Sequence, residues 1–315
     1  MRISLELVLP ANYRVGDILA FHGRDSEQVS ERCVMPVETL SQSLPSTLEK
    51  ALIWEGYPAC LGIQFNGQTA TVVLDLDMSL AQSSRAKHAA QWQVNLQAMV
   101  RRMLGLNQDV EAFLFQYCEH PQLGGLLQQR PNLRVPLSVN PFEALCWAVT
   151  GQQISVAAAV SIRRRFIQLL GCLHSSGLRC HPSVEQVAAS ELAVLCNVGL
   201  SKTKAQTLIF LAQALACGQL KLPQSDDQLL DHVSAETLRR QLLGIRGIGP
   251  WTVNYVLLRG FAYLDGSLHG DVAVRRNLQL LLARHDKISE LETQQWLAQF
   301  SPWRALVAAH LWMLA

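Results

Sequence analysis

The sequence lacks a strong excess of charge of either sign: 27 Lys and Arg stand against 25 Asp and Glu, a formal net charge of +2 over 315 residues. Such a chain has no general attraction to a polyanion, so any binding of nucleic acid must depend on local basic patches such as Arg163–Arg165 or Arg275–Arg276. It also lacks an uncharged apolar run of membrane-spanning length, and its start, Met1–Leu7, contains Glu6, unlike the core of a signal peptide. We therefore expect a cytoplasmic protein that makes no contact with membranes.

Paired cysteines are missing as well. None of the eight cysteines forms a Cys-x-x-Cys motif, and several lie in apolar helical contexts, which favours reduced, buried thiols over a disulfide framework. They are Cys33, Cys60, Cys118, Cys146, Cys172, Cys180, Cys196 and Cys217. We predict no metal site.

Hydrophobic residues are plentiful, at 49%, and the length suits two or three packed subdomains. Alternating apolar residues over 3–9 predict a strand, and Asn66-Gly67 between two further strand patterns predicts a hairpin turn, because both residues tolerate positive φ. We expect residues 1–82 to form a small β-rich domain.

Helical spacing begins near Ser83, and we expect 83–138 to pack with the C-terminal part of the chain. Asn140-Pro141, an N-cap followed by a proline at the first helical position, starts the longest helical region. The expected fold class is α+β, with the β-rich N-terminal domain followed by a mostly α-helical body.

The stretch Leu242–Tyr255 predicts two helices joined by a glycine-rich turn. Ser234 is a good N-cap for the first helix, and Pro250 suits the start of the second. Gly247 and Gly249 place free N–H groups at the positive end of a helix dipole, where a phosphate binds well. The alternative is an ordinary αα-hairpin whose glycines only permit a tight turn.

The run Gly244-Ile-Arg-Gly-Ile-Gly-Pro-Trp-Thr252 resembles the helix-hairpin-helix of the DNA glycosylase superfamily, and in particular its AlkA-like branch, the bacterial 3-methyladenine DNA glycosylases. In that family a glycine-containing loop with a catalytic aspartate follows the hairpin. Here Gly266–Arg275 contains Asp271, 22 residues after Gly249. The resemblance is strongest from Asn140 to Trp312, and it implies a helical domain over 139–265 and a catalytic-aspartate loop with C-terminal helices over 266–315.

The resemblance implies a role for each matching residue. Asp271 would stabilise the oxocarbenium ion that develops when a base leaves, although it also suits the N-cap of the next helix, and the two roles are compatible. Gln153 occupies the position of the residue that fills the gap left by a flipped base, where a surface glutamine is the alternative. Four residues would bind the DNA backbone: Gly247, Gly249, Thr252 and Lys202.

Three aromatic residues are candidates for the base pocket: Trp251, Tyr255 and Trp303. Their faces would attract a base that methylation of a ring nitrogen has made cationic, by about 0.5–2 kcal/mol for each desolvated contact. Packing in the core is the alternative reading for each of them.

Two features restrict the chemistry. Trp251 stands where the bifunctional members of the superfamily carry a Schiff-base lysine, which argues against strand cleavage. No cysteine follows Cys217, so the iron–sulfur loop of some relatives is excluded. No cofactor is required, although a monovalent cation on the hairpin carbonyls is an option.

The predicted function is that of a monofunctional DNA glycosylase that hydrolyses the N-glycosidic bond of alkylated bases, such as 3-methyladenine and 7-methylguanine. Its partner would be double-stranded DNA containing damaged bases, and no protein partner is implied. Two alternatives stay open: a monofunctional glycosylase for another damaged purine, and a helix-hairpin-helix module that binds DNA without catalysis.

Overall fold

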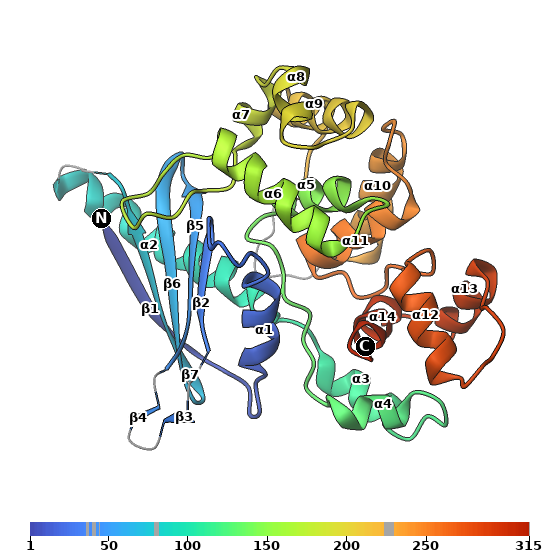
Figure 1. The fold of residues 1–315 in the computed structure, drawn as a ribbon. Helices are drawn as coiled ribbons and strands as arrows, with labels where there is room; N and C mark the ends of the chain where they lie inside the picture. Colours follow the sequence, from blue (N-terminus) through green and yellow to red (C-terminus); the bar gives the residue numbers. More distant parts are fainter. Residues whose placement is uncertain (36–37, 40–41, 44, 79–81, 224–229, 315) are drawn as a thin grey trace.

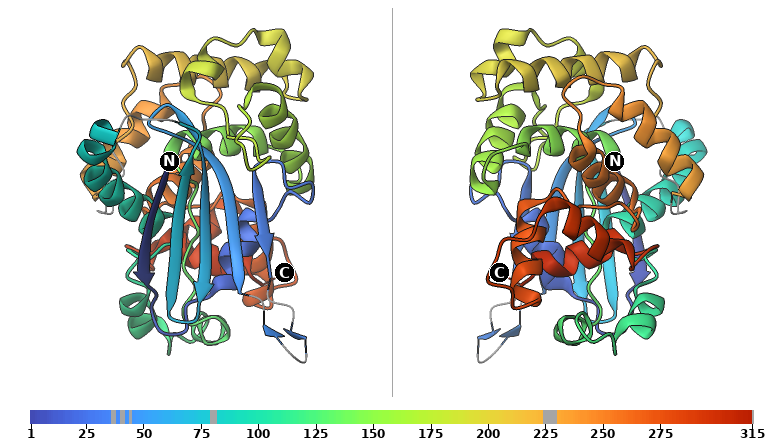
Figure 2. Two further views of the ribbon diagram at one scale, coloured as in Figure 1. Left: turned by 90° about the vertical axis from the view of Figure 1, so that its left-hand side faces the viewer. Right: turned by 90° about the vertical axis from the view of Figure 1, so that its right-hand side faces the viewer.

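A five-stranded antiparallel sheet stands beside a larger body of helices in the computed structural model (Figure 1). The structure describes residues 1–35, 38–39, 42–43, 45–78, 82–223 and 230–314. The strand order is β1-β7-β6-β5-β2, and β3 and β4 form a separate pair. The strands are β1 (Arg2–Val8), β2 (Glu31–Val34), β3 (Glu38–Thr39), β4 (Gln42–Ser43), β5 (Ser46–Trp54), β6 (Tyr57–Asn66) and β7 (Thr69–Leu76). In the left view of Figure 2 the sheet stands in front of the helical body.

The hairpin between β6 and β7 differs by one residue from the predicted turn. Asn66 pairs with Thr69, so the two loop residues are Gly67 and Gln68 rather than Asn66 and Gly67. Gly67 has φ +66° and therefore takes the position that needs a left-handed backbone. The amide of Asn66 bonds the hydroxyl of Thr71 across the pair, which favours a paired asparagine over one in the turn.

Helix α2 (Gln82–Met103) packs on the sheet, contrary to the expectation that all of 83–138 packs with the C-terminal part. Its Leu96, Val100 and Met103 share a core with Leu61 and Leu74 of the sheet. Helix α1 (Val15–His22) buries Ile18 and Leu19 in the same core. Helical spacing in a sequence indicates that a helix has an apolar face, but it does not say which surface that face covers.

The next two short helices, α3 (Val110–Tyr117) and α4 (Gly124–Gln129), do lie against the C-terminal segment. The Phe113 ring lies 5.9 Å from that of Trp303, and the Tyr117 ring lies 5.3 Å from that of Phe300. These aromatic contacts belong to the large core of the helical body.

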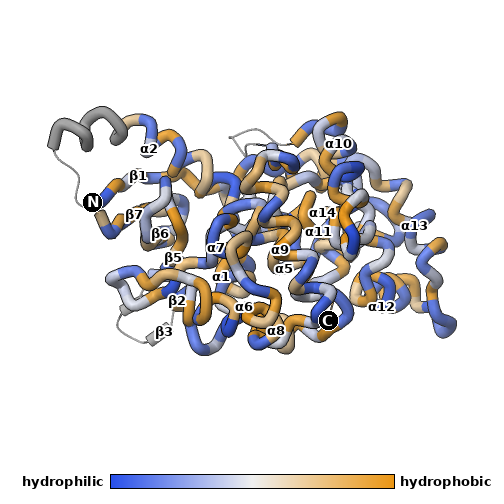
Figure 3. The backbone as a smooth tube through the Cα atoms, turned by 90° about the horizontal axis from the view of Figure 1, so that it is seen from above, coloured by the Kyte–Doolittle hydropathy of each residue, from blue (hydrophilic) through white to orange (hydrophobic). Residues whose placement is uncertain are grey.

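The helical body consists of ten further helices in the described part of the chain. They are α5 (Pro141–Gly151), α6 (Val156–Leu170), α7 (Val184–Ala188), α8 (Leu192–Asn197), α9 (Lys202–Ala216), α10 (His232–Leu243), α11 (Pro250–Phe261), α12 (Val272–Leu281), α13 (Glu290–Ala298) and α14 (Arg304–Trp312). Helices α5, α9, α11 and α14 gather in the middle of the body (Figure 3). Among the described helices, none is long and apolar enough to cross a membrane.

The N-caps of α5 and α10 can be compared with the helix starts that the sequence predicts. Asn140 caps α5 by accepting from the Glu143 N–H at 2.8 Å, with Pro141 in the first turn, as the sequence predicts. Helix α10 begins earlier than predicted, because Asp231 accepts from the backbone N–H of Ser234 at 3.0 Å and takes the cap position. Either residue can cap a helix, and the sequence signal at Ser234 was therefore ambiguous.

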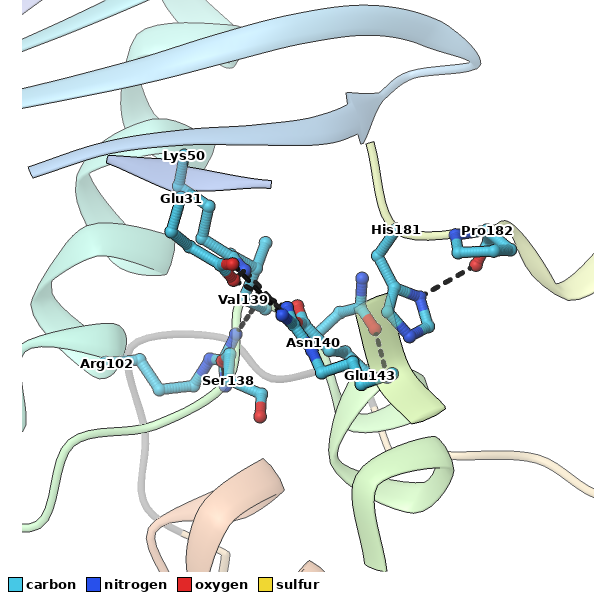
Figure 4. Close-up of polar contacts among 10 residues, drawn as sticks. Glu31, Lys50, Arg102, Ser138, Val139, Asn140, Glu143, His181 and Pro182 are labelled. Atoms are coloured by element: carbon cyan, nitrogen blue, oxygen red, sulfur yellow. Dashed lines mark hydrogen bonds and ion pairs between the residues drawn. The ribbon is translucent and has the colours of Figure 1, made fainter. Parts of the chain in front are cut away.

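A buried ionic cluster joins the sheet to the helical body (Figure 4). Lys50 of β5 donates to Glu31 of β2 and, at 2.9 Å, to Glu143 of α5. Arg163 of α6 bonds both carboxylates, at 3.0 Å to Glu31 and 2.8 Å to Glu143. Burial would raise the pKa of the Glu31 carboxyl, but the charges of Arg163 and Lys50 outweigh it and hold that pKa at about 2. The pKa of Glu143 is likewise held well below its usual value, because Lys50 and Arg163 outweigh its burial.

Candidate active site

The turn between α10 and α11 lines a cleft of about 1140 Å³. Gly247 has φ +91°, and a Cβ there would meet the Thr207 hydroxyl at 2.4 Å, so only glycine fits. Gly249 is different: its φ of −107° is open to any residue and its surroundings leave room for a Cβ. Within the described chain, neither glycine N–H donates to a carbonyl or side chain. Their amides are therefore available to a ligand.

A second turn, between α5 and α6, lines the same cleft and is tied to the hairpin. The Gln152 side chain donates to the carbonyl of Gly247 at 2.9 Å and to the hydroxyl of Thr252 at 2.8 Å. The ammonium of Lys204 donates to the carbonyls of Thr150 and Gln152, at 2.9 and 2.7 Å. These bonds hold the turn directly before Gln153.

Gln153 itself is exposed, lines the cleft and has a left-handed backbone, with φ +56°. Such a conformation is uncommon outside glycine and needs support from its surroundings. The position of the side chain at the cleft edge keeps the wedge role open as a proposal.

Two of the residues expected at the DNA backbone occupy different environments. Lys202 is exposed in the first turn of α9. Thr252, in contrast, is only 2% exposed, and its hydroxyl accepts the bond from Gln152, so its side chain cannot reach a phosphate at the surface. Lys204, two residues after Lys202, is turned inward to the carbonyls of the second turn.

The Asp271 carboxylate accepts hydrogen bonds from two directions. Its Oδ1 accepts the backbone N–H groups of Ala273 and Val274 at 2.9 and 3.0 Å, which makes it the N-cap of α12. Its Oδ2 accepts the indole N–H of Trp251 at 2.8 Å, and Oδ1 also accepts that of Trp312 at 3.3 Å. Asp271 is thus both a cap and a cleft residue, held between two aromatic side chains.

One face of α11 supplies a wall of the cleft. Trp251, Tyr255 and Arg259 follow one another at four-residue spacing, which places them on the same side of the helix. The rings of Trp251 and Tyr255 lie 5.3 Å apart, and the Trp312 ring lies 6.3 Å from that of Tyr255. These three aromatic side chains surround the space in front of Asp271.

Trp303, which the resemblance placed in the base pocket, lies outside the cleft. Its ring packs 5.9 Å from Phe113 and 6.1 Å from Tyr117, in the core behind the site. Trp312 stands nine residues later, half a rotation around the helix axis, and therefore faces the cleft instead. A tryptophan in an apolar helix needs a hydrogen-bond acceptor for its N–H. This need is the one feature of the sequence that could have indicated a polar partner for Trp312 in the cleft.

Three further cleft residues were missed: Arg24, Trp147 and Arg259. Arg24 follows α1 in the N-terminal domain, and no local pattern could have placed it beside α11. Within the described residues, no cluster of His, Cys, Asp and Glu could hold a metal ion.

Residues 146–302 match the family described as "HhH-GPD superfamily base excision DNA repair protein", and the chain belongs to this superfamily. Among curated relatives, the DNA-3-methyladenine glycosylase of Bacillus subtilis (strain 168) is 27% identical over 216 residues, which cover 68% of this chain and 70% of that protein. DNA-3-methyladenine glycosylase 2 of Escherichia coli (strain K12) is 30% identical over 192 residues, covering 60% of this chain and 63% of that protein.

Solved structures share the fold over almost the whole chain. A 3-methyladenine DNA glycosylase from Archaeoglobus fulgidus has a TM-score of 0.75 at 18% identity and covers 98% of this chain and 97% of that one. An 8-oxoguanine glycosylase/lyase from Clostridium acetobutylicum, in complex with double-stranded DNA, has a TM-score of 0.65 at 14% identity, covering 98% and 94%. At these identities the likeness concerns the fold, including the N-terminal sheet.

Proposed function

We propose that the protein is a monofunctional DNA glycosylase that removes alkylated bases, such as 3-methyladenine and 7-methylguanine, from double-stranded DNA. The observation that carries the proposal is the Asp271 carboxylate, which faces the cleft between the indole N–H groups of Trp251 and Trp312. A binding module without catalysis has no need for a carboxylate fixed inside an aromatic cleft. The names of the curated relatives point to the same activity.

The chemistry begins with access, because a glycosidic bond inside a duplex cannot be reached until the nucleotide leaves the stack. The free amides of Gly247 and Gly249, with Lys202 nearby on α9, would hold the phosphate backbone. Gln153 would fill the gap left by the base. The extruded base would stack on the aromatic walls of the cleft.

Bond cleavage leaves positive charge on the sugar. The Asp271 carboxylate would stabilise that oxocarbenium ion and orient the attacking water. A base methylated at a ring nitrogen is already cationic and leaves readily, so little acid catalysis is needed. No lysine lies among the described residues that line the cleft, which supports hydrolysis without a Schiff base.

The Asp271→Asn variant tests the proposal. Asparagine keeps the size of the side chain and an oxygen for the α12 cap, but it removes the negative charge. We expect single-turnover release of 3-methyladenine and 7-methylguanine to fall at least about a hundredfold, equivalent to about 3 kcal/mol. Affinity for duplex DNA with an abasic site should persist, and the melting temperature should change little. Release within a few-fold of wild type would remove Asp271 from the chemistry and leave only the cap.

A monovalent cation on the hairpin carbonyls is a second prediction. The carbonyls of Arg246 and Gly247 each accept one protein donor, from Thr207 and Gln152, and each keeps a second lone pair. If the cation is used, replacing K⁺ by tetramethylammonium at constant ionic strength should weaken DNA binding. Equal affinity in both salts would contradict it.

A further inference from the structure

Arg24 brings a free guanidinium from the N-terminal domain to the cleft. Its Cζ lies 4.5 Å from the ring centroid of Phe21 and 5.4 Å from that of Trp147, so two aromatic faces hold the planar group. The nearby carboxylates do not neutralise it, because Asp25 and Glu27 are both bonded to Arg164. Arg24 therefore keeps its N–H donors for whatever enters the cleft.

Arg259 adds a second positive charge to the cleft wall. Its guanidinium lies 4.5 Å from the Phe21 ring and 5.3 Å from that of Trp312, and it donates to the Pro136 carbonyl at 2.7 Å. Burial, and to a smaller extent the charge of Arg24, lower the pKa of Arg259 to about 10, which leaves it protonated at neutral pH. It is fixed and partly satisfied, whereas Arg24 is free to bond.

These charges change what the cleft can select. Its charged lining residues are Arg24, Arg259 and Asp271, two cations and one anion. The aromatic faces and the Asp271 carboxylate attract a cationic base, but the two guanidinium groups repel it, so the positive charge of the base is not a sufficient basis for selection. The hydrogen-bonding groups on the edge of the base that faces the free guanidinium of Arg24 then decide which bases the cleft selects.

Purine lesions differ at that edge. Hypoxanthine and 7-methylguanine carry a carbonyl oxygen at C6, which accepts from a guanidinium, and unmethylated N7 in hypoxanthine gives a second acceptor beside it. Adenine-type bases, including 3-methyladenine, carry an amino group at C6. Two donors would then face each other, so a site that offers donors to an oxygen favours the 6-oxo edge over the 6-amino edge.

We propose that Arg24 reads the C6 edge of the extruded base, so that the cleft selects 6-oxopurine lesions over 6-aminopurine lesions. This inference rests on the proposed function, because it assigns the substrate class of the same site. Since the residue comes from the N-terminal domain, it also gives that domain a direct part in the choice of base.

The first experiment measures the edge preference without catalysis. Free hypoxanthine and free adenine, which differ at C6, are titrated against the protein bound to abasic-site duplex DNA, with tryptophan fluorescence as the signal. We expect wild type to bind hypoxanthine at least about tenfold more tightly, and Arg24→Met to bind both alike. Arg24→Lys, which keeps the charge but loses the planar fork, should keep only part of the preference. Equal affinities in wild type, or an unchanged preference in Arg24→Met, would overturn the proposal.

The second experiment uses methylated duplex DNA, which presents 7-methylguanine and 3-methyladenine in one reaction. The ratio of the two single-turnover release rates, compared between variant and wild type, cancels the different intrinsic stabilities of the two bonds. Arg24→Met should lower release of 7-methylguanine about tenfold and should not lower that of 3-methyladenine. An equal decrease in the release rates of both bases would assign Arg24 to general DNA binding and would overturn the proposal that it recognises the C6 edge.

The exposed Arg240 of α10 provides a control, because Arg240→Met removes the same charge away from the cleft. It should leave both the titration and the release ratio as in wild type. If wild-type protein releases neither base from the methylated DNA, the proposed function fails, whereas the titration still decides whether Arg24 selects the C6 edge.

Discussion

Trp251 combines three features: it lies in the first turn of α11, forms part of a wall of the cleft and donates to Asp271 at 2.8 Å. Trp251→Phe keeps an aromatic face and removes the N–H. We expect base release to slow about tenfold, because the carboxylate loses the donor that fixes its orientation, an effect of about 1.4 kcal/mol. Single-turnover excision measures it.

Two other tryptophans serve as matched controls for that variant. The Trp296 N–H donates to Gln122 at 2.7 Å, and neither residue lines the cleft, while Trp303 packs in the aromatic core. Trp296→Phe and Trp303→Phe should lower the melting temperature at most modestly and leave excision intact. A loss of excision in Trp303→Phe as large as in Trp251→Phe would restore Trp303 to the base pocket.

At the scale of single elements, Gly249→Ala is the informative change in the hairpin. A methyl group fits there without a clash and the backbone is ordinary, so the fold should tolerate it. The methyl group would keep a phosphate away from the amide of the α11 N-terminus. We expect binding to all duplex sequences to weaken several-fold and alike, because backbone contacts carry no sequence information.

Gly247→Ala gives the contrasting result. Its positive φ and the clash with Thr207 predict a loss of stability of about 1–3 kcal/mol, so weaker binding by this variant alone would not identify a DNA contact. Unchanged affinity of a normally folded Gly249→Ala for abasic-site DNA would remove the hairpin from the interface.

The elements also show what the sequence could and could not predict. The α5 cap at Asn140 and the α12 cap at Asp271 are local signals, and the structure contains both. The side of a helix that a distant residue faces is not local. Trp303 directly precedes α14 and Trp312 ends it, about half a rotation away around the axis, and only Trp312 lines the cleft. Arg24 reaches the cleft because the sheet domain packs there, and no spacing in the sequence indicates that packing.

At the scale of the whole molecule, buried histidines predict how stability depends on pH. Burial is the main cause that lowers the pKa of His22 and His310 to about 3 and that of His181 to about 4. The unfolded chain, with histidine pKa values near 6.5, binds more protons than the folded protein below that pH, so the unfolding free energy falls as pH decreases. We expect a loss of about 1–2 kcal/mol per histidine between pH 6.5 and 5.

The depressed pKa of Glu31, at about 2, adds a further loss below pH 4.5, in the same direction. Urea unfolding at pH 7, 6 and 5 measures the first window. His310 is buried beside the Phe113 ring, and His310→Leu replaces it with an apolar side chain that cannot be protonated. The unfolding free energy of this variant should fall less between pH 7 and 5 than that of wild type, by the contribution of one histidine. An unfolding free energy that stays constant from pH 7 to 5 in wild type would contradict the assignment of neutral histidines.

Helix α11 carries the hairpin amides at its first turn and the cleft wall along Trp251, Tyr255 and Arg259. From Gly249 to Arg259 the rise is about 15 Å, and the number of residues sets it. In the proposed complex the protein therefore has little freedom to bring its phosphate contact and its pocket closer together. We expect the double helix to adapt its shape to both contacts, so that its stiffness at the neighbouring base steps contributes to the choice of lesion. Excision should be faster where flexible pyrimidine–purine steps flank the damaged base.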